Sequence, residues 1–191
     1  MQKNHRHFII YKPYGFLSQF INNQTKRKKK LLGELYNFPE KTMAIGRLDV
    51  KSEGLLLLTT DGKVSDFVTT RGNVEKEYFV QVNGEITQDK IEILKNGVAI
   101  GFNGKKYITK QCKASIIKAP YFPKRNQKIR DDRHGPTSWI SIILTEGKFR
   151  QVRKMTSAVG HPTLRLIRIR VGNIKLNDLK VGDVKEVESL V

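Results

Sequence analysis

Short apolar segments with the patterns of β-strands recur along the whole chain, and they constrain the fold more than any other feature of the sequence. Some alternate between apolar and polar residues, and others are continuous runs such as Leu55-Leu56-Leu57-Leu58. These patterns predict strands at residues 8–11, 42–45, 54–60, 77–82, 113–117, 138–144 and 163–171. A sheet is therefore expected at the centre of the protein.

Helical spacing is visible in two places. Residues 87–96 have Thr87 at the N-cap position and Gly97 just past the end. The apolar face of a second helix is predicted from Phe149, Val152, Met155 and Val159. Because strands outnumber helices and do not alternate with them strictly, the pattern predicts an α+β fold. Its sheet is expected to be mixed and mainly antiparallel, with the helices packed on it.

The chain has 191 residues, of which 38% are hydrophobic, so it can bury a core as one domain over residues 1–191 or as two small joined lobes. The run of four leucines is far shorter than the roughly 20 residues that span a bilayer. Cys112 is the only cysteine, and no charged and apolar leader is visible at the start. These features predict a cytoplasmic protein without a membrane partner.

Positive charge is concentrated in one stretch of the chain. The whole sequence has 36 Lys and Arg against 18 Asp and Glu, a net charge of +18, and residues 105–170 hold 17 basic and 3 acidic residues. A second basic run covers residues 26–30 and is interpreted as a solvated loop. Such an excess in a chain that can fold predicts a polyanionic partner.

Common templates for cofactors and metals are missing from the sequence. It contains no glycine-rich phosphate loop, and its histidines and Cys112 have no partners at metal-ligand spacing. Asp61-Gly62 predicts a tight turn after the leucine run. We therefore expect neither a metal ion nor a nucleotide cofactor.

A polar loop at residues 46–54 lies between two predicted strands and reads Gly46-Arg47-Leu48-Asp49-Val50-Lys51-Ser52-Glu53-Gly54. Loops that connect strands often carry the chemistry of an enzyme. Taken alone, however, this loop is more typical of a charged turn in which Asp49 caps the backbone.

The wider chain resembles the rRNA pseudouridine synthases of the RsuA type. Residues 46–62 resemble the family's motif I, residues 76–80 its motif II and residues 146–155 its motif III, and residues 166–176 resemble the last motif. The first strand of the catalytic domain begins at Phe8, which leaves no room for the N-terminal S4 domain of most members. The resemblance is therefore to the RluE branch, whose members isomerise one uridine of 23S rRNA.

This resemblance implies a role for each matching residue. Asp49 would be the catalytic group, acting on the ribose either as nucleophile or as base, and Arg153 would be the cation that keeps it ionised. Arg47 would hold the space left by the flipped nucleotide. Tyr78 and Leu166 would pack on the two sides of the uracil. Ordinary structural roles, such as a strand tyrosine or a core leucine, remain open for these residues.

The basic region is expected to bind RNA mainly through its phosphates. The residues predicted to do so are Lys124, Arg125, Lys128, Arg130, Arg150, Lys154, Arg165 and Arg168. Tyr121, Phe122 and Trp139 frame the first four and could stack on bases or form local core. The expected partner is 23S rRNA or its precursor, and the enzyme is expected to be a monomer. The alternative is a non-catalytic rRNA-binding or ribosome-assembly protein.

Overall fold

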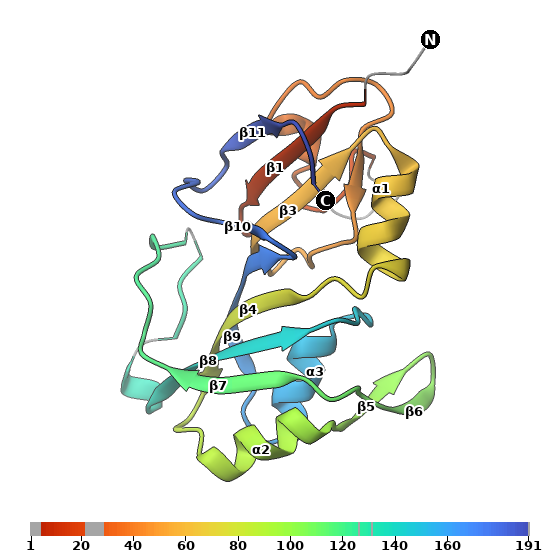
Figure 1. Ribbon diagram of the computed structural model, residues 1–191. Helices are drawn as coiled ribbons and strands as arrows, with labels where there is room; N and C mark the ends of the chain where they lie inside the picture. The colour runs from red at the N-terminus through yellow and green to blue at the C-terminus, as the bar shows by residue number, and fades with distance from the viewer. Residues whose placement is uncertain (1–4, 22–28, 126, 131, 191) are drawn as a thin grey trace. The chain divides into compact units, whose positions relative to one another are not determined.

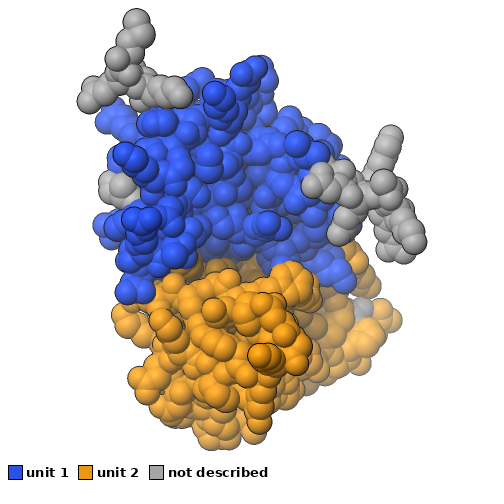
Figure 2. All heavy atoms as spheres, turned by 90° about the vertical axis from the view of Figure 1, so that its right-hand side faces the viewer, with its two compact units in different colours: residues 1–74, 168–191 blue, residues 75–167 orange. Residues whose placement is uncertain are grey.

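The computed structural model describes residues 5–21, 29–125, 127–130 and 132–190. It divides into two compact units, which Figure 2 shows in different colours. Unit 1 comprises Met1–Val74 and Arg168–Val191, and unit 2 comprises Glu75–Ile167. Of the basic run at residues 26–30, only Lys29 and Lys30 lie within the described residues.

Unit 1 is built on antiparallel strands. Its elements are β1 (His7–Lys12), the 3-10 turn Leu32–Glu34, β2 (Met43–Ile45), β3 (Glu53–Thr59), α1 (Gly62–Asp66), the π-helical turn Phe67–Arg71, β10 (Ile174–Lys175) and β11 (Val184–Val187). Strand β1 pairs with β11 on one side and with β3 on the other, and β2 pairs with β3 (Figure 1). Strand β9 (Thr163–Val171) begins in unit 2 and ends in unit 1, where β10 pairs with its last residues.

The core of unit 1 forms around β3, because every residue of this strand is buried. The continuous run Leu55–Leu58 is the pattern expected of a strand that is covered on both faces. Rings of Phe8, Phe20, Tyr36 and Phe38 form an aromatic cluster next to it, with centroid distances of 5.1–5.9 Å. This apolar packing fixes the strands that carry the polar loop of residues 46–52.

The turn predicted at Asp61-Gly62 is instead the start of α1. The Asp61 carboxylate accepts a 2.8 Å hydrogen bond from the backbone amide of Lys63 and so caps the helix. Aspartate followed by glycine is typical both of a tight turn and of an N-cap, and the local sequence alone did not distinguish them.

Unit 2 contains a second antiparallel arrangement and two helices. Its elements are β4 (Lys76–Asn83), α2 (Gln88–Asn96), β5 (Ala99–Phe102), β6 (Lys105–Ile108), β7 (Lys113–Ile117), the 3-10 turn Asp132–His134, β8 (Thr137–Leu144) and α3 (Gln151–Ala158). Strand β8 lies between β4 and β7, and β5 and β6 form a separate hairpin (Figure 1). Helix α2 packs against β7, and α3 packs against β5. The α+β class with a mainly antiparallel sheet is confirmed.

Helix α2 agrees with its sequence pattern. Thr87 is its N-cap, Ile91 and Leu94 are fully buried, and Gly97 ends it with a φ of 98°. A Cβ atom at position 97 would lie 2.3 Å from the carbonyl oxygen of Thr109, so only glycine fits this turn.

Helix α3 is shorter than its apolar spacing predicts. Val152, Met155 and Val159 are buried as expected, but Phe149 lies before the helix and is 67% exposed. The reason is Arg150, whose φ of 55° is left-handed and breaks the helical path just before Gln151. No helix in the described part of the chain is long and apolar enough to cross a membrane.

Candidate functional site

The loop that carries Asp49 is held at several points by the segment that follows β1. Ser18 Oγ donates a 2.8 Å hydrogen bond to the carbonyl of Leu48 and accepts one of 3.0 Å from the amide of Leu48. The amide of Gly15 donates to the carbonyl of Val50 at 2.8 Å. Because backbone groups on both sides of Asp49 are bonded in this way, the main chain that carries its side chain is held in place.

Two further features shape this loop from within. Gly46 has a φ of 67° and provides the left-handed turn that leads out of β2. The amide of Ser52 donates a 2.9 Å hydrogen bond to the carbonyl of Asp49, which closes a tight turn before β3. Leu48 is buried beside the half-buried Asp49 and anchors the loop on the core.

Lys12, at the end of β1, is a fully buried cation beneath this loop. Its ammonium group donates hydrogen bonds to the carbonyls of Pro13 at 2.9 Å and Phe16 at 2.8 Å. Lysine is rarely buried to this extent unless it has a specific partner. These bonds close the turn of residues 12–16, which leads directly into the segment that holds the Asp49 loop.

The charges around Lys12 form a cluster within unit 1. Burial lowers the pKa of Lys12 to about 7, the nearby carboxylates of Glu53 and Asp49 act in the opposite direction, and the Arg168 guanidinium lowers it further. Glu53 is also fully buried. Two cations and two carboxylates therefore share the low-dielectric region around the loop.

Arg168 belongs to this cluster and is only 4% exposed. Its Nε donates a 2.7 Å hydrogen bond to the carbonyl of Leu55, and its buried Nη2 has no hydrogen-bond partner among the described residues. Arg165 is similarly buried, donates to the carbonyl of Pro123 at 2.9 Å and lies over the Phe122 ring. Their burial argues against the contacts with RNA phosphates that the sequence predicts for both arginines.

Unlike Arg165 and Arg168, Arg47 has an exposed side chain. It lies two residues before Asp49 and lines a pocket in unit 1. An exposed arginine here is free of the core and can reach a ligand that approaches Asp49.

The candidate base-contacting residues lie in unit 2. Tyr78 is buried on β4, on the same face as Lys76, Val80 and Val82, and it is opposite Ile142 of β8. Leu166 is buried on β9. Both positions suit a core residue as well as a residue at the bottom of a site.

Arg153 lies on the first turns of α3 and is half-buried. The loop before this helix is tied down by Gln151, whose amide nitrogen donates to the Glu146 carboxylate at 2.6 Å. Gln151 Oε1 accepts a 2.8 Å hydrogen bond from the amide of Lys148. Glu146 also accepts hydrogen bonds from the Tyr107 hydroxyl and the amide of Lys110. The residues of the proposed motif III therefore form one bonded unit.

Two neighbouring cations on this segment have different surroundings. Arg150 is exposed at the left-handed position before α3. Lys154 donates a 2.6 Å hydrogen bond to the carbonyl of Gly101 and lies 5.4 Å from the centre of the Phe149 ring. Of the two, Arg150 has the position better suited to a phosphate contact.

The basic segment at residues 124–130 is only partly exposed. Lys124 and Lys128 are exposed, while Arg130 donates to the carbonyls of His134 and Pro136 and so braces the loop. Arg125 is half-buried and donates to the carbonyl of Gln127 at 2.9 Å. Lys124 and Lys128 are thus the residues of this segment most available to RNA.

The aromatic residues that frame this segment also differ in their exposure to solvent. The rings of Phe122 and Trp139 lie 6.2 Å apart, Phe79 packs on Phe122, and all three are half-buried. Tyr121 is 97% exposed, so it is the most accessible of the three predicted aromatic residues Tyr121, Phe122 and Trp139.

Arg47, Asp49 and Arg168 all belong to unit 1, whereas Tyr78, Arg153 and Leu166 belong to unit 2. A pairing of Asp49 with Arg153 joins residues of different units and stays a prediction.

Sequence reasoning missed Lys12 and Glu53, although a lysine between an apolar strand and a proline was a visible signal. Among the described residues, no cluster of three or more His, Cys, Asp or Glu could hold a metal ion.

Comparison with known proteins identifies relatives over nearly the whole chain. The family model described as RNA pseudouridylate synthase matches residues 6–158. Ribosomal large subunit pseudouridine synthase E of Vibrio parahaemolyticus is 38% identical over 187 residues, which cover 97% of this chain and 75% of the relative. The protein of the same name from Xanthomonas axonopodis pv. citri is 39% identical over 173 residues, which cover 90% and 88%.

A solved structure supports the same relationship. A crystal structure of pseudouridylate synthase is similar with a TM-score of 0.75 and 25% sequence identity, covering 96% of this chain and 70% of that one.

Proposed function

Because the chain belongs to the RNA pseudouridylate synthase family, we propose that it isomerises a specific uridine of 23S ribosomal RNA to pseudouridine, with Asp49 as the catalytic group. The observation that carries this proposal is the family match across residues 6–158, which includes the rigidly held Asp49 loop. The two relatives from Vibrio and Xanthomonas are named for the large ribosomal subunit, which supports that substrate.

The reaction conserves every atom of the uridine. The bond between C1′ and N1 breaks, the uracil turns, a new bond forms between C5 and C1′, and the proton leaves C5 while N1 gains one. Neither an oxidant nor water is consumed, so side chains can supply all the catalytic groups. Asp49 acts on the ribose either as nucleophile at C1′ or as the base that removes a ribose proton.

The surroundings of Asp49 support this role. Hydrogen bonds from Gly15, Ser18 and Ser52 fix the backbone of its loop, so the loop does not have to be ordered during the reaction. In the proposal, Arg153 keeps the carboxylate ionised, and Tyr78 and Leu166 pack on the two faces of the uracil. The exposed Arg47 fills the place of the target nucleotide in the RNA stack, since the base must leave the stack to reach Asp49.

The RNA contacts proposed outside the site rest on exposed cations. Lys124, Lys128 and Arg150 have exposed side chains, which suit phosphate binding. Arg125, Arg130 and Lys154 donate hydrogen bonds to backbone carbonyls of the protein. We also propose that the enzyme acts as a monomer in the cytoplasm.

The decisive experiment is chemical mapping of pseudouridine in ribosomal RNA from cells that lack this protein. One pseudouridine of the large-subunit RNA should disappear and should return when wild-type protein is supplied, but not when the Asp49→Asn variant is supplied. An unchanged map, together with retained binding of the purified protein to ribosomal RNA, would indicate a binding protein without this activity.

A further inference from the structure

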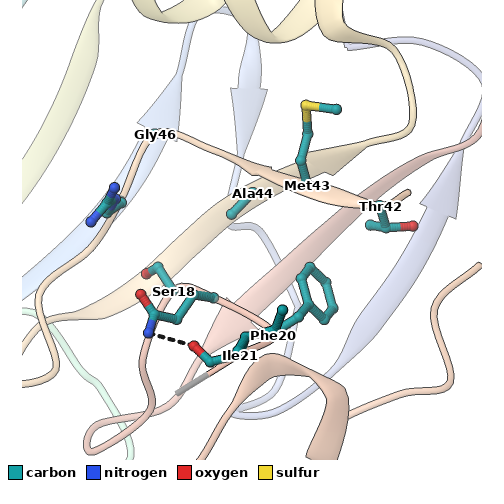
Figure 3. Close-up of a pocket in the computed structure, with 9 residues that line it drawn as sticks. Ser18, Phe20, Ile21, Thr42, Met43, Ala44 and Gly46 are labelled. Carbon is teal, nitrogen blue, oxygen red and sulfur yellow. Dashed lines mark hydrogen bonds between the residues drawn. The ribbon is translucent and has the colours of Figure 1, made fainter. Parts of the chain in front are cut away.

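A pocket of about 560 Å³ opens beside the Asp49 loop in unit 1 (Figure 3). One wall is formed by residues 18–21 and the other by β2 and the turn that follows it. The lining residues are Ser18, Gln19, Phe20, Ile21, Thr42, Met43, Ala44, Gly46 and Arg47. A volume of this order is typical of small-ligand sites and leaves room for a single nucleobase.

Much of the lining is apolar although it is open to solvent. Ile21 is 71% exposed and Met43 is 37% exposed. Phe20 is kept in place by Phe38, with ring centroids 5.4 Å apart and nearly perpendicular planes. A fixed aromatic ring flanked by exposed aliphatic side chains is the kind of surface on which a flat apolar group can lie.

The pocket is physically continuous with the Asp49 loop. Ser18, in one wall, is bonded to both backbone groups of Leu48, the residue directly before Asp49. Arg47 lines the pocket and also belongs to the loop. An occupant of the pocket therefore lies next to the place where the target nucleotide must enter.

The charge at the pocket favours an anionic ligand. Arg47 is exposed and is the one charged residue among those that line the pocket. A partly apolar lining with an arginine at its border matches a nucleobase that is attached to sugar and phosphate.

We propose that this pocket receives an unpaired base of the RNA substrate that flanks the target uridine, and that it thereby contributes to the choice of target. The inference rests on the proposed function, because it takes RNA as the substrate. A nucleotide bound here fixes the register of the strand, so that the neighbouring uridine is the one presented to Asp49.

The experiment is a double-mutant cycle between protein and RNA. The RNA is a synthetic fragment around the mapped uridine, in which each flanking nucleotide in turn is made abasic. The variant is Ile21→Ser with Met43→Ser, two exposed positions at which the fold should tolerate serine. The control is Ile93→Ser, at an isoleucine on α2 that is 45% exposed and does not line the pocket.

At one flanking position, wild-type protein should lose about tenfold in affinity for the abasic fragment. The Ile21→Ser, Met43→Ser variant should bind the intact fragment with about tenfold lower affinity than the wild type. Its affinity for the abasic fragment should be no lower than for the intact one. The Ile93→Ser control should respond to the abasic site as the wild type does. This coupling would assign the base to the pocket.

The inference would be overturned if, at every flanking position, the losses of affinity caused by the abasic site and by the pocket variant were additive. Equal affinity of wild type and pocket variant for the intact RNA would also overturn it. In either case wild-type protein would still form pseudouridine, and the proposed function would stand. Failure of the proposed function has a different signature, which is the absence of pseudouridine after incubation with wild-type protein.

Discussion

The ammonium group of Lys12 donates a 2.8 Å hydrogen bond to the carbonyl of Phe16, and both residues are buried. This bond closes the turn from which Gly15 and Ser18 reach the Asp49 loop. Lys12 thus shapes the backbone that positions Asp49, and in its protonated form it also adds positive charge near this carboxylate.

Replacing Lys12 by Met should change how stability depends on pH. Burial lowers the pKa of folded Lys12 to about 7, whereas the ordinary value is 10.5. Between these values the unfolded chain binds more protons, so the contribution of Lys12 to stability rises with pH and is lost as pH falls through about 7. The free energy of unfolding of wild type minus that of Lys12→Met should increase by up to about 1.4 kcal/mol per pH unit in this window.

Denaturant unfolding at several pH values measures this difference. Lys63→Met, at an exposed lysine of α1, is the matched control and should show a flat difference. A flat difference for Lys12→Met as well would mean that Lys12 keeps its ordinary titration in the folded protein.

Asp49→Asn should abolish turnover, because the amide keeps the size and hydrogen bonding of the side chain but lacks the negative charge that either mechanism needs. The single-turnover rate on an rRNA fragment should fall by at least roughly 10²- to 10⁴-fold. RNA affinity should persist or increase slightly, since the phosphate contacts remain and one repulsive charge is removed. Isomerisation at the wild-type rate would exclude Asp49 as the catalytic group.

Arg153→Met should slow the chemical step by about 100-fold or more at saturating RNA, if Arg153 stabilises the charge of Asp49. Arg150→Met is the contrast, because the exposed Arg150 is expected to bind phosphate. It should weaken RNA binding and leave the rate at saturating RNA nearly unchanged. The same pattern for both variants would show that Arg153 is a phosphate contact and has no part in the chemical step.

The double variant Lys124→Ser, Lys128→Ser should bind RNA with lower affinity and with a smaller dependence on salt concentration, because both lysines are exposed in the basic segment. For each lost phosphate contact, the slope of log affinity against log salt should decrease by about 1. Titrations of labelled rRNA fragments at several salt concentrations give this slope. Replacement of the exposed Lys175 and Lys180 of unit 1 by Ser is the control, and an equal effect there would indicate only a loss of net charge.

Most of the longer strands could be predicted, because their hydrophobic patterns reflect which side chains are buried. The continuous leucines of β3 and the alternation in β4 each mark a strand, and residues 113–117 and 163–171 match their predicted bounds. The strands that were missed, β5, β6, β10 and β11, are short and largely exposed at their outer faces. They are stabilised by pairing, locally for β5 with β6 and for β10 with β9, and with the distant β1 for β11. The hydrophobic pattern of a single short segment does not record such pairing.

The candidate site was predictable only in part. The motif resemblance identified Asp49, but charge alone could not separate an exposed arginine from a buried one. Arg47 is exposed, whereas Arg165 and Arg168 are buried on β9, although arginine side chains are mostly exposed to solvent. Backbone carbonyls of Pro123 and Leu55 satisfy them, and these partners lie 42 and 113 positions away in the chain.

Strand β11 pairs with β1, with Val187 opposite His7, and an ion pair joins Arg6 to Glu186 at 2.6 Å across 180 positions. All of unit 2 is therefore synthesised between two strands that must meet. During translation the edge of β1 stays open until β11 has been made, and the Arg168 side chain that bonds to β3 is made only after all of unit 2. The segments of unit 2 are therefore complete earlier than those of unit 1. The Asp49 loop lies in the unit whose sheet closes later.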